Sequence, residues 1–143
     1  THNAYYRIPT LSTAGNRFKI FLGYLSNDGS GAINTDGIWF EYSDNANSGN
    51  WQIKCRSASV TTTANTSTAA DTDWHKYTII VNAAGTSVAF YIDDVEVANS
   101  PITTNIPSEI GTACMITKST GTTARTLQFD WYDQTVNLTN PRY

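Results

Sequence analysis

The chain has 143 residues, a length that suits one domain and is too short for two ordinary ones. Only 15% of the residues are charged, and the net charge is -3, so no basic field is available to attract nucleic acid or an anionic membrane. No segment approaches the roughly 18 consecutive apolar residues of a transmembrane helix. We therefore expect one domain over residues 1–143, with no nucleic acid partner and no membrane insertion.

Apolar residues recur at every second position along several segments, which is typical of strands with one buried face. The pattern predicts strong strands near 17–25, 37–43, 50–57, 74–82, 86–93 and 125–133, and weaker ones at 4–8, 58–63, 95–98 and 113–118. No segment keeps apolar residues at helical spacing over three turns, so no long helix is expected. The sequence therefore predicts an all-β fold, an antiparallel β-sandwich of the jelly-roll kind.

The same alternation assigns the tryptophans to faces of the sheets. We predict Trp51, Trp74 and Trp131 in the core, because each is read in phase with the apolar residues of its strand. Trp39 and Tyr91 fall out of phase and are predicted to point outward. A large ring on an outer face either stacks on a sugar or lies at a subunit contact, where aromatic residues are enriched.

Sugar binding is the chemistry that these residues suit best, since a ring can stack on the apolar face of a pyranose while nearby amides bond its hydroxyls. The loop 44–50 is rich in asparagine. We name five candidate glycan contacts: Trp39, Tyr91, Asn45, Asn47 and Asn50. The oxygens of this loop would also suit calcium, but an Asx-rich turn that satisfies its own backbone is the favoured interpretation. No metal site and no cofactor is predicted.

Catalytic arrangements have little support. His75 lies near Asp71 and Asp73, but no Gly-x-Ser-x-Gly nucleophile elbow accompanies it, and His2 is expected to lie at a frayed terminus. Glycoside hydrolysis needs two carboxylates about 5–10 Å apart, and Glu41 is the only carboxylate that we would nominate. We predict no catalytic residue and no enzyme activity.

The chain has two cysteines, Cys55 and Cys114, both within apolar strand patterns. They lack the CxxC spacing of a zinc site. Two buried free thiols that pack as small hydrophobes are the favoured interpretation. A disulfide across the sandwich is the alternative, and the sequence leaves it open.

Residues 37–56 resemble a module of phage virion proteins, in which a strand ending in Tyr-Ser-Asp leads through Asn-Ser-Gly-Asn-Trp into the next strand. The resemblance continues in further segments, namely 7–13, 73–75, 81–88, 90–93, 103–107 and 118–127. The layout around Trp74 and Phe90–Asp93 is also similar to concanavalin A-like and laminin G-like sandwiches, although Asp94 stands where glycine is usual. The module begins with further strands, which implies a fragment or strands supplied within an assembly.

This resemblance implies a non-catalytic surface or structural module of a virion, such as a tail fibre, a spike or a capsid decoration, located on the virion surface or otherwise outside the cell. The implied partners are copies of the chain itself, as a trimer, other virion proteins and a cell-surface glycan. Repetition would multiply a weak affinity into avidity. The alternative is a carbohydrate-binding module of a secreted bacterial enzyme or adhesin, which a monomer with clear sugar affinity would favour.

Overall fold

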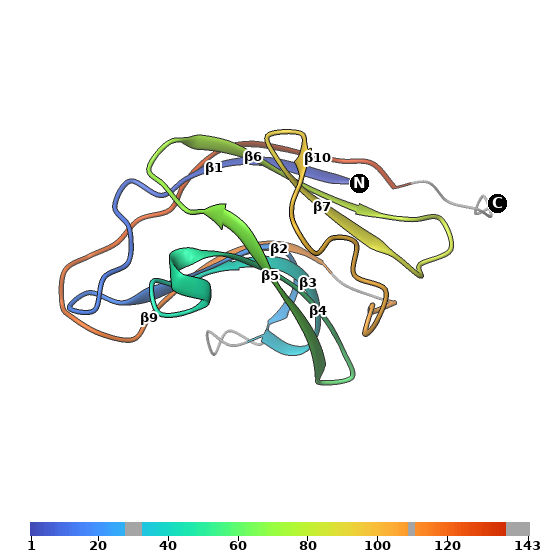
Figure 1. The fold of residues 1–143 in the computed structure, drawn as a ribbon, viewed down its shortest axis with the longest axis horizontal. Helices are drawn as coiled ribbons and strands as arrows, with labels where there is room; N and C mark the ends of the chain where they lie inside the picture. The colour runs from blue at the N-terminus through green and yellow to red at the C-terminus, as the bar shows by residue number, and fades with distance from the viewer. Residues whose placement is uncertain (28–32, 109–110, 137–143) are drawn as a thin grey trace.

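The computed structural model describes residues 1–27, 33–108 and 111–136. Over these ranges the chain forms ten β-strands in two five-stranded sheets, which Figure 1 shows as two stacked layers. The single helical segment of the described ranges is a 3₁₀ turn, η1 (Asn47–Gly49). None of the described segments is a helix long and apolar enough to cross a membrane.

The first sheet has the strand order β10-β1-β6-β7-β8. Its strands are β1 (His2–Arg7), β6 (Trp74–Val81), β7 (Val88–Ile92), β8 (Val95–Glu96) and β10 (Gln128–Gln134). The second sheet has the order β5-β4-β3-β2-β9. Its strands are β2 (Phe18–Asn27), β3 (Ile33–Tyr42), β4 (Asn50–Ser57), β5 (Val60–Ala69) and β9 (Thr112–Lys118). All the neighbouring strands pair antiparallel, so the prediction of an antiparallel β-sandwich is confirmed.

The core between the sheets centres on four aromatic rings. Phe40 meets Trp51, Tyr77 and Phe90 edge-on, with ring centroids 6.2, 5.4 and 5.2 Å apart. Phe40 and Trp51 belong to the second sheet, whereas Tyr77 and Phe90 belong to the first. Burial of one such ring stabilises the fold by about 1.5–3 kcal/mol, and each edge-to-face pair adds roughly 0.5–1.5 kcal/mol. This ring cluster therefore holds the two sheets against each other.

The two-residue alternation correctly predicts most of the core. The predicted inward residues that are buried are Phe18, Ile20, Leu22, Tyr24, Ile38, Phe40, Tyr42, Trp51, Ile53, Cys55, Tyr77, Ile79, Val88, Phe90 and Ile92. These residues come from strands of both sheets and alternate with outward side chains. The prediction that Trp51 lies in the core is thus confirmed.

Trp74 is predicted in the core, but the residue is 43% exposed, so this prediction was wrong. It begins β6 three positions before the buried Tyr77. Successive side chains of a strand point to opposite faces, so an odd separation places Trp74 on the outer face of the sheet. The prediction was wrong because it grouped Trp74 with the apolar content of its strand instead of with its pleat position.

Trp131, also predicted in the core, is 43% exposed for a different reason. The register between β1 and β10 places Tyr132 opposite Ala4 and Phe129 opposite Tyr6, so three steps along β10 span two steps along β1. Such a bulge adds one residue to β10 and reverses the alternation beyond it. Phe129 and Tyr132 therefore share the inward side, and Trp131 turns outward.

The N-terminal strand is held firmly and not frayed, contrary to the expectation for His2. β1 lies between β10 and β6, and His2 is 1% exposed. Its ring lies 5.3 Å from that of Tyr24 and 6.2 Å from that of Tyr132. Burial of the imidazole, helped by the nearby positive charge of the N-terminus, lowers the pKa of His2 to about 4. His2 is therefore a neutral residue at the edge of the core.

The cysteines are both free, but only one of them is buried. Burial raises the pKa of the Cys55 thiol to about 12. Cys114 is exposed, so the prediction of two buried thiols was wrong. Cys114 lies opposite the buried Leu22, but its strand, β9, is at the edge of the sheet and has a neighbour on one side only. Three strand spacings of about 4.8 Å separate β4 from β9, which exceeds the roughly 7 Å between Cα atoms that a disulfide tolerates.

We predict that Ellman's reagent at pH 8 titrates one thiol in the folded chain and both in denaturant. The thiolate is the reactive species, and burial keeps Cys55 protonated at that pH. Cys114→Ser should abolish the fast reaction, whereas Cys55→Ala should preserve it. Two fast-reacting thiols, or a mass that shows a disulfide, would contradict this arrangement of the sheets.

Candidate functional site

The outer face of the second sheet carries a depression of about 400 Å³. The described residues that line it are Lys19, Phe21, Ile33, Trp39, Glu41, Lys54, Arg56, Thr61 and Thr117. Three of them are cations and one is a carboxylate, in a chain whose net charge is -3. A local excess of positive charge on a weakly acidic protein attracts anions. We name this feature the basic depression.

Strand register assembles the basic depression from residues far apart in the sequence. Trp39 and Glu41 point outward from β3 because they alternate with Ile38, Phe40 and Tyr42, which belong to the core between the sheets. Lys54 of β4 lies directly opposite Trp39, and Phe21 of β2 lies directly opposite Glu41. Side chains in such opposed pairs have Cβ atoms about 4.5–5.5 Å apart. Pairing of the central strands is thus sufficient to bring the four residues together.

Trp39 lies on the outer face, as predicted, but it is only 3% exposed, so the prediction of an exposed ring was wrong. The ring lies against Gly37, where an added Cβ would come within 3.1 Å of the indole carbon Cε3. It packs in a second apolar cluster with Phe21, Leu25 and Ile33. Trp39 is therefore a buried floor of the basic depression and not an open platform for stacking a sugar.

Glu41 is the lone carboxylate of the basic depression and is 4% exposed. Its Oε2 accepts a hydrogen bond from the indole Nε1 of Trp39 at 3.2 Å and lies 3.0 Å from Lys54 Nζ, while its Oε1 lies 3.5 Å from Lys19 Nζ. A buried carboxylate costs several kcal/mol unless it is paired. Both of its oxygens are engaged, and no second carboxylate of the described residues lines the depression.

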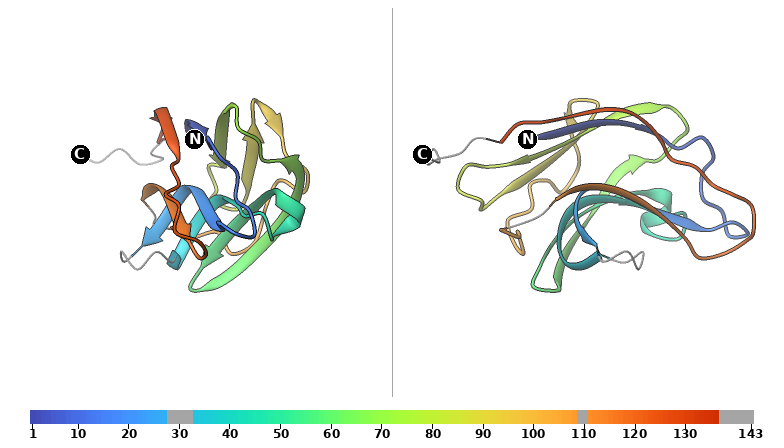
Figure 2. Two further views of the ribbon diagram at one scale, coloured as in Figure 1. Left: turned by 90° about the vertical axis from the view of Figure 1, so that its left-hand side faces the viewer. Right: turned by 180° about the vertical axis from the view of Figure 1, so that it is seen from behind.

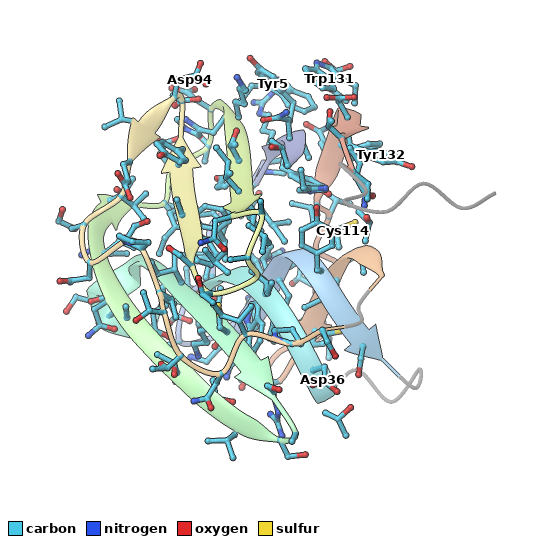
Figure 3. The ribbon with its side chains drawn as sticks, turned by 90° about the vertical axis from the view of Figure 1, so that its right-hand side faces the viewer. Tyr5, Asp36, Asp94, Cys114, Trp131 and Tyr132 are labelled. Atoms are coloured by element: carbon cyan, nitrogen blue, oxygen red, sulfur yellow. The ribbon has the colours of Figure 1, made fainter. Side chains whose placement is uncertain are left out.

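Arg56 is the cation of the basic depression that joins no ion pair among the described residues. Its Nε is buried and makes no hydrogen bond within the described structure. The nearby Asp36 has a lowered pKa, caused mainly by hydrogen bonds from Thr35 and from the backbone N–H of Ala58 and less by the charge of Arg56. The Asp36 carboxylate, labelled in Figure 3, is thus held by its own loop. The charges of Asp36 and Arg56 still interact, but none of the ion pairs among the described residues includes Arg56.

A second depression, of about 350 Å³, is acidic. Its described lining residues are Trp51, Ser67, Thr68, Ala69, Asp71, His75, Ile92, Asp93, Val95, Glu96, Val97 and Ala98. We name it the acidic depression. It opens where β5 of the second sheet approaches β6, β7 and β8 of the first.

His75 is clamped inside the acidic depression between two carboxylates. Its Nδ1 lies 2.5 Å from Asp93 Oδ2, and its Nε2 lies 2.8 Å from Asp71 Oδ1. Burial opposes the charged imidazole, but the hydrogen bonds and charges of Asp93 and Asp71 outweigh it and raise the pKa of His75. Asp73, which the sequence also placed near His75, instead donates its backbone N–H to Asp71. Neither ring nitrogen is free to act as a catalytic base.

Residues 1–130 match the model of a family described as SO2946-like, C-terminal domain. The chain belongs to this family. The description names no activity or ligand. A comparison with curated proteins found no match.

The fold of this SO2946-like domain is similar to that of a β-glucanase from Bacillus licheniformis, with a TM-score of 0.59 and 15% sequence identity. The similarity covers 92% of the SO2946-like chain and 63% of the glucanase chain, so the chain spans less than two thirds of that enzyme's length. At this identity the likeness shows the fold alone. Together with the two antiparallel sheets, it confirms the jelly-roll, concanavalin A-like β-sandwich.

The five predicted glycan contacts of the SO2946-like domain do not form one site. Tyr91 of β7 lies opposite Thr78 of β6 and alternates with buried residues, so it points to the outer face of the first sheet. Trp39 faces outward from the second sheet. The whole core separates the two rings, because alternation reports which face a side chain takes but not which sheet carries it.

The predicted asparagines serve their own loop. Asn47 donates from Nδ2 to the backbone carbonyls of Trp51 and Thr66, both at 2.8 Å. Asn45 accepts a hydrogen bond from a serine hydroxyl two residues earlier, and the backbone N–H of Asn50 bonds the carbonyl of Asn47. These contacts match the interpretation of a turn that satisfies itself, and they leave Asn45 as the exposed member.

The calcium alternative for this loop finds no support in its acidic residue. Asp44 accepts hydrogen bonds from Ser12 at 2.6 Å and from Arg17 at 3.0 and 3.1 Å. These bonds lower the pKa of Asp44, with the hydrogen bond from Arg17 as the largest cause. Over the described ranges, no three His, Cys, Asp or Glu residues are grouped so as to hold a metal ion.

Sequence reasoning missed the cations of the basic depression, although a signal was present. Lys54 and Arg56 alternate with the buried Ile53 and Cys55 of β4, so both must point outward. Lys19 stands in the same relation to the buried residues of β2. The missing information was that β2 and β4 flank β3, which only the strand order supplies.

We predict that the His75 clamp stabilises the fold at low pH and loses this effect as the pH rises. The folded pKa of His75 is raised above its unfolded value of about 6.5, so its contribution is complete below pH 6.5 and disappears as the pH passes the folded pKa. The loss of unfolding free energy in His75→Asn, measured by urea titration, should be larger at pH 5.5 than at pH 9.

His2→Gln is the matched control, because burial lowers the pKa of His2 and gives the opposite sign. Its neutral form is the stable one, so the wild-type chain should lose stability from His2 as the pH falls below about 6.5. A destabilisation by His75→Asn that is the same at pH 5.5 and pH 9 would contradict the clamp.

Proposed function

We propose that this domain is a non-catalytic surface module of a virion, of the tail fibre, spike or capsid decoration kind, that binds a cell-surface glycan. The observation that carries the binding role is the basic depression on the outer face of the second sheet. Its volume of about 400 Å³ lies within the range of about 300–1,000 Å³ that is usual for ligand sites. Its residues stand on paired strands, which hold a binding geometry more rigidly than loops do.

The chemistry of the lining suits a saccharide. Lys19, Lys54 and Arg56 supply hydrogen-bond donors, and the hydroxyls of Thr61 and Thr117 supply both donors and acceptors. Apolar residues form the floor. A sugar presents the same mixture of hydroxyls and apolar C–H surface, so the depression complements it.

The state of the acidic residues supports a role without catalysis. Glu41 is engaged by two lysines and an indole, so it is not poised to protonate or attack a substrate. Asp71 and Asp93 are both engaged by His75. A glycosidase instead keeps two carboxylates on either side of the reacting bond.

The virion assignment is supported by the resemblance of residues 37–56. This segment contains the C-terminal part of β3 and all but the last residue of β4, and it supplies Trp39, Glu41, Lys54 and Arg56. The part of the chain that resembles a virion module is therefore the part that builds most of the basic depression. In a repetitive assembly, many copies of a weak site would bind a cell surface tightly.

We predict that the 143-residue chain binds glycans through the second sheet. Thr61→Tyr should fill the basic depression without removing a charge and weaken binding at least tenfold, as measured by calorimetry on the strongest hit of a glycan array. Tyr91→Ser, on the outer face of the first sheet, should leave binding unchanged. An array with no hit would contradict the glycan role, and a loss confined to Tyr91→Ser would move the site to the other sheet.

Copies of the chain itself are the proposed partners at the edge strand β10. This strand pairs on one side only, with β1, and both views of Figure 2 place it along the border of the first sheet. Its aromatic residues are unusually open: Phe129 is 48% exposed, Trp131 43% and Tyr132 56%. Exposed aromatic clusters and unpaired strand edges are surfaces on which protein chains associate.

The exposed rings of β10 stand on both sides of this edge strand. Trp131 lies against Tyr5, with ring centroids 5.3 Å apart, and Figure 3 shows this pair beside Tyr132. Below Tyr132, an apolar depression of about 250 Å³ runs down to Cys114 of the second sheet. An apolar surface of this kind is covered in a homo-oligomer by the same chain, which leaves the basic depression on the other sheet face free.

We predict that the chain self-associates through β10. Light scattering or sedimentation equilibrium should show an oligomer, and the double variant Trp131→Ser/Tyr132→Ser should weaken association at least tenfold, since buried aromatic residues dominate such contacts. Val60→Ser is the control, because Val60 is an exposed apolar residue of β5. A wild-type monomer with clear sugar affinity would favour the carbohydrate-binding module of a secreted enzyme or adhesin instead.

A further inference from the structure

We infer that the basic depression binds the anionic group of an acidic saccharide, with Arg56 as its principal contact. This inference rests on the proposed glycan binding and specifies its substrate class. The anionic group is a carboxylate or a sulfate ester, which share a planar or trigonal face of negatively charged oxygens.

The described residues that line the basic depression carry a net positive charge. Lys19 and Lys54 both approach the same carboxylate, that of Glu41, at 3.5 and 3.0 Å. One carboxylate neutralises one of these cations, and the nearby charge of Asp36 offsets part of that of Arg56, so the lining keeps a net positive charge. The chain as a whole is acidic, with a net charge of -3, so this excess is local and directs anions to one face.

Arg56 has the geometry and the need for an anionic partner. The guanidinium presents donors in a planar fork that matches two oxygens of a carboxylate or sulfate. Its Nε is buried without a hydrogen bond, and none of the ion pairs among the described residues includes Arg56. A buried donor left unsatisfied is unfavourable. Because Nε is buried, a bound anion satisfies it only when the Arg56 side chain turns this atom towards the depression.

The surroundings of Arg56 favour a saccharide over a bare anion. Trp39, Phe21 and Ile33 form an apolar floor that excludes water and strengthens charge pairing next to it. Thr61 lies directly opposite Arg56 on β5, where its hydroxyl can bond a sugar hydroxyl beside the acid group. Charge, apolar surface and hydroxyl partners together describe a uronic acid or a sulfated sugar.

The test compares sugars that differ only in their charge. The probes are oligogalacturonide, alginate, hyaluronan and sulfated galactan fragments, each beside its carboxyl-reduced or desulfated form, titrated into the 143-residue chain. At least one acidic probe should bind tenfold or more tightly than its neutral form, and the affinity should fall as salt is raised. Titration should also shift the NMR signal of the Arg56 Nε–H group.

Variants of Arg56 distinguish the contribution of the planar guanidinium donors from that of the positive charge. Arg56→Gln should abolish the preference for the acidic probe, while Arg56→Lys should retain part of it, since lysine keeps the charge but not the fork. Arg125→Gln is the matched control, because Arg125 is not among the residues that line the basic depression. Circular dichroism and the urea midpoint show whether each variant is folded. If Arg56→Gln is not folded, the salt dependence of binding by the wild type tests the role of charge instead.

The outcomes distinguish this inference from the proposed function. Equal binding of acidic and neutral forms overturns the acidic specificity but leaves glycan binding in place. If inorganic sulfate or acetate binds as tightly as the oligosaccharides, the claim that the site recognises a saccharide is overturned. Failure of every acidic and neutral sugar overturns both proposals. Acidic preference with an unshifted Arg56 signal overturns the role given to Arg56.

Discussion

The contact of Phe40 and Trp51 with Tyr77 and Phe90 is the constraint on which the rest of this structure depends. These four rings are buried where the two sheets face each other, and each sheet contributes two of them. Because side chains alternate along a strand, burying Phe40 turns its neighbours Trp39 and Glu41 to the outer face. Core packing thus orients the residues of the basic depression without contacting most of them.

Charge is sparse in this chain, and its distribution follows from what each buried ionic group requires. Glu41 is 4% exposed, and it is stable there because two lysines from neighbouring strands reach it. Two aspartates flank His75 and favour its charged form. One depression consequently has an excess of positive charge and the other an excess of negative charge. The difference arises from side-chain pairing and not from the overall composition.

Several features of the site and the fold followed from the sequence alone. The alternating pattern correctly located most of the strands and most of the core, although β5 extends to Ala69, well beyond the predicted 58–63, and it placed Trp39 on an outer face. It failed for Trp131, because a bulge in β10 reverses the alternation and leaves no mark in the apolar pattern. It also failed for the exposure of Trp39 and Cys114. Exposure depends on which neighbours cover a face, and neighbours come from distant parts of the chain.

The sequence by itself determined the class of fold, since alternation with a period of two can be satisfied only by strands that bury one face. It also determined which side chains share a face in the strands of regular register, such as β3 and β7. The tertiary structure alone decided the strand order, which sets Lys19 and Lys54 on either side of Glu41 and leaves the buried Nε of Arg56 without a hydrogen bond among the described residues. Strand order is a long-range property, because it follows from the packing of complete sheets and not from the local pattern of any one strand.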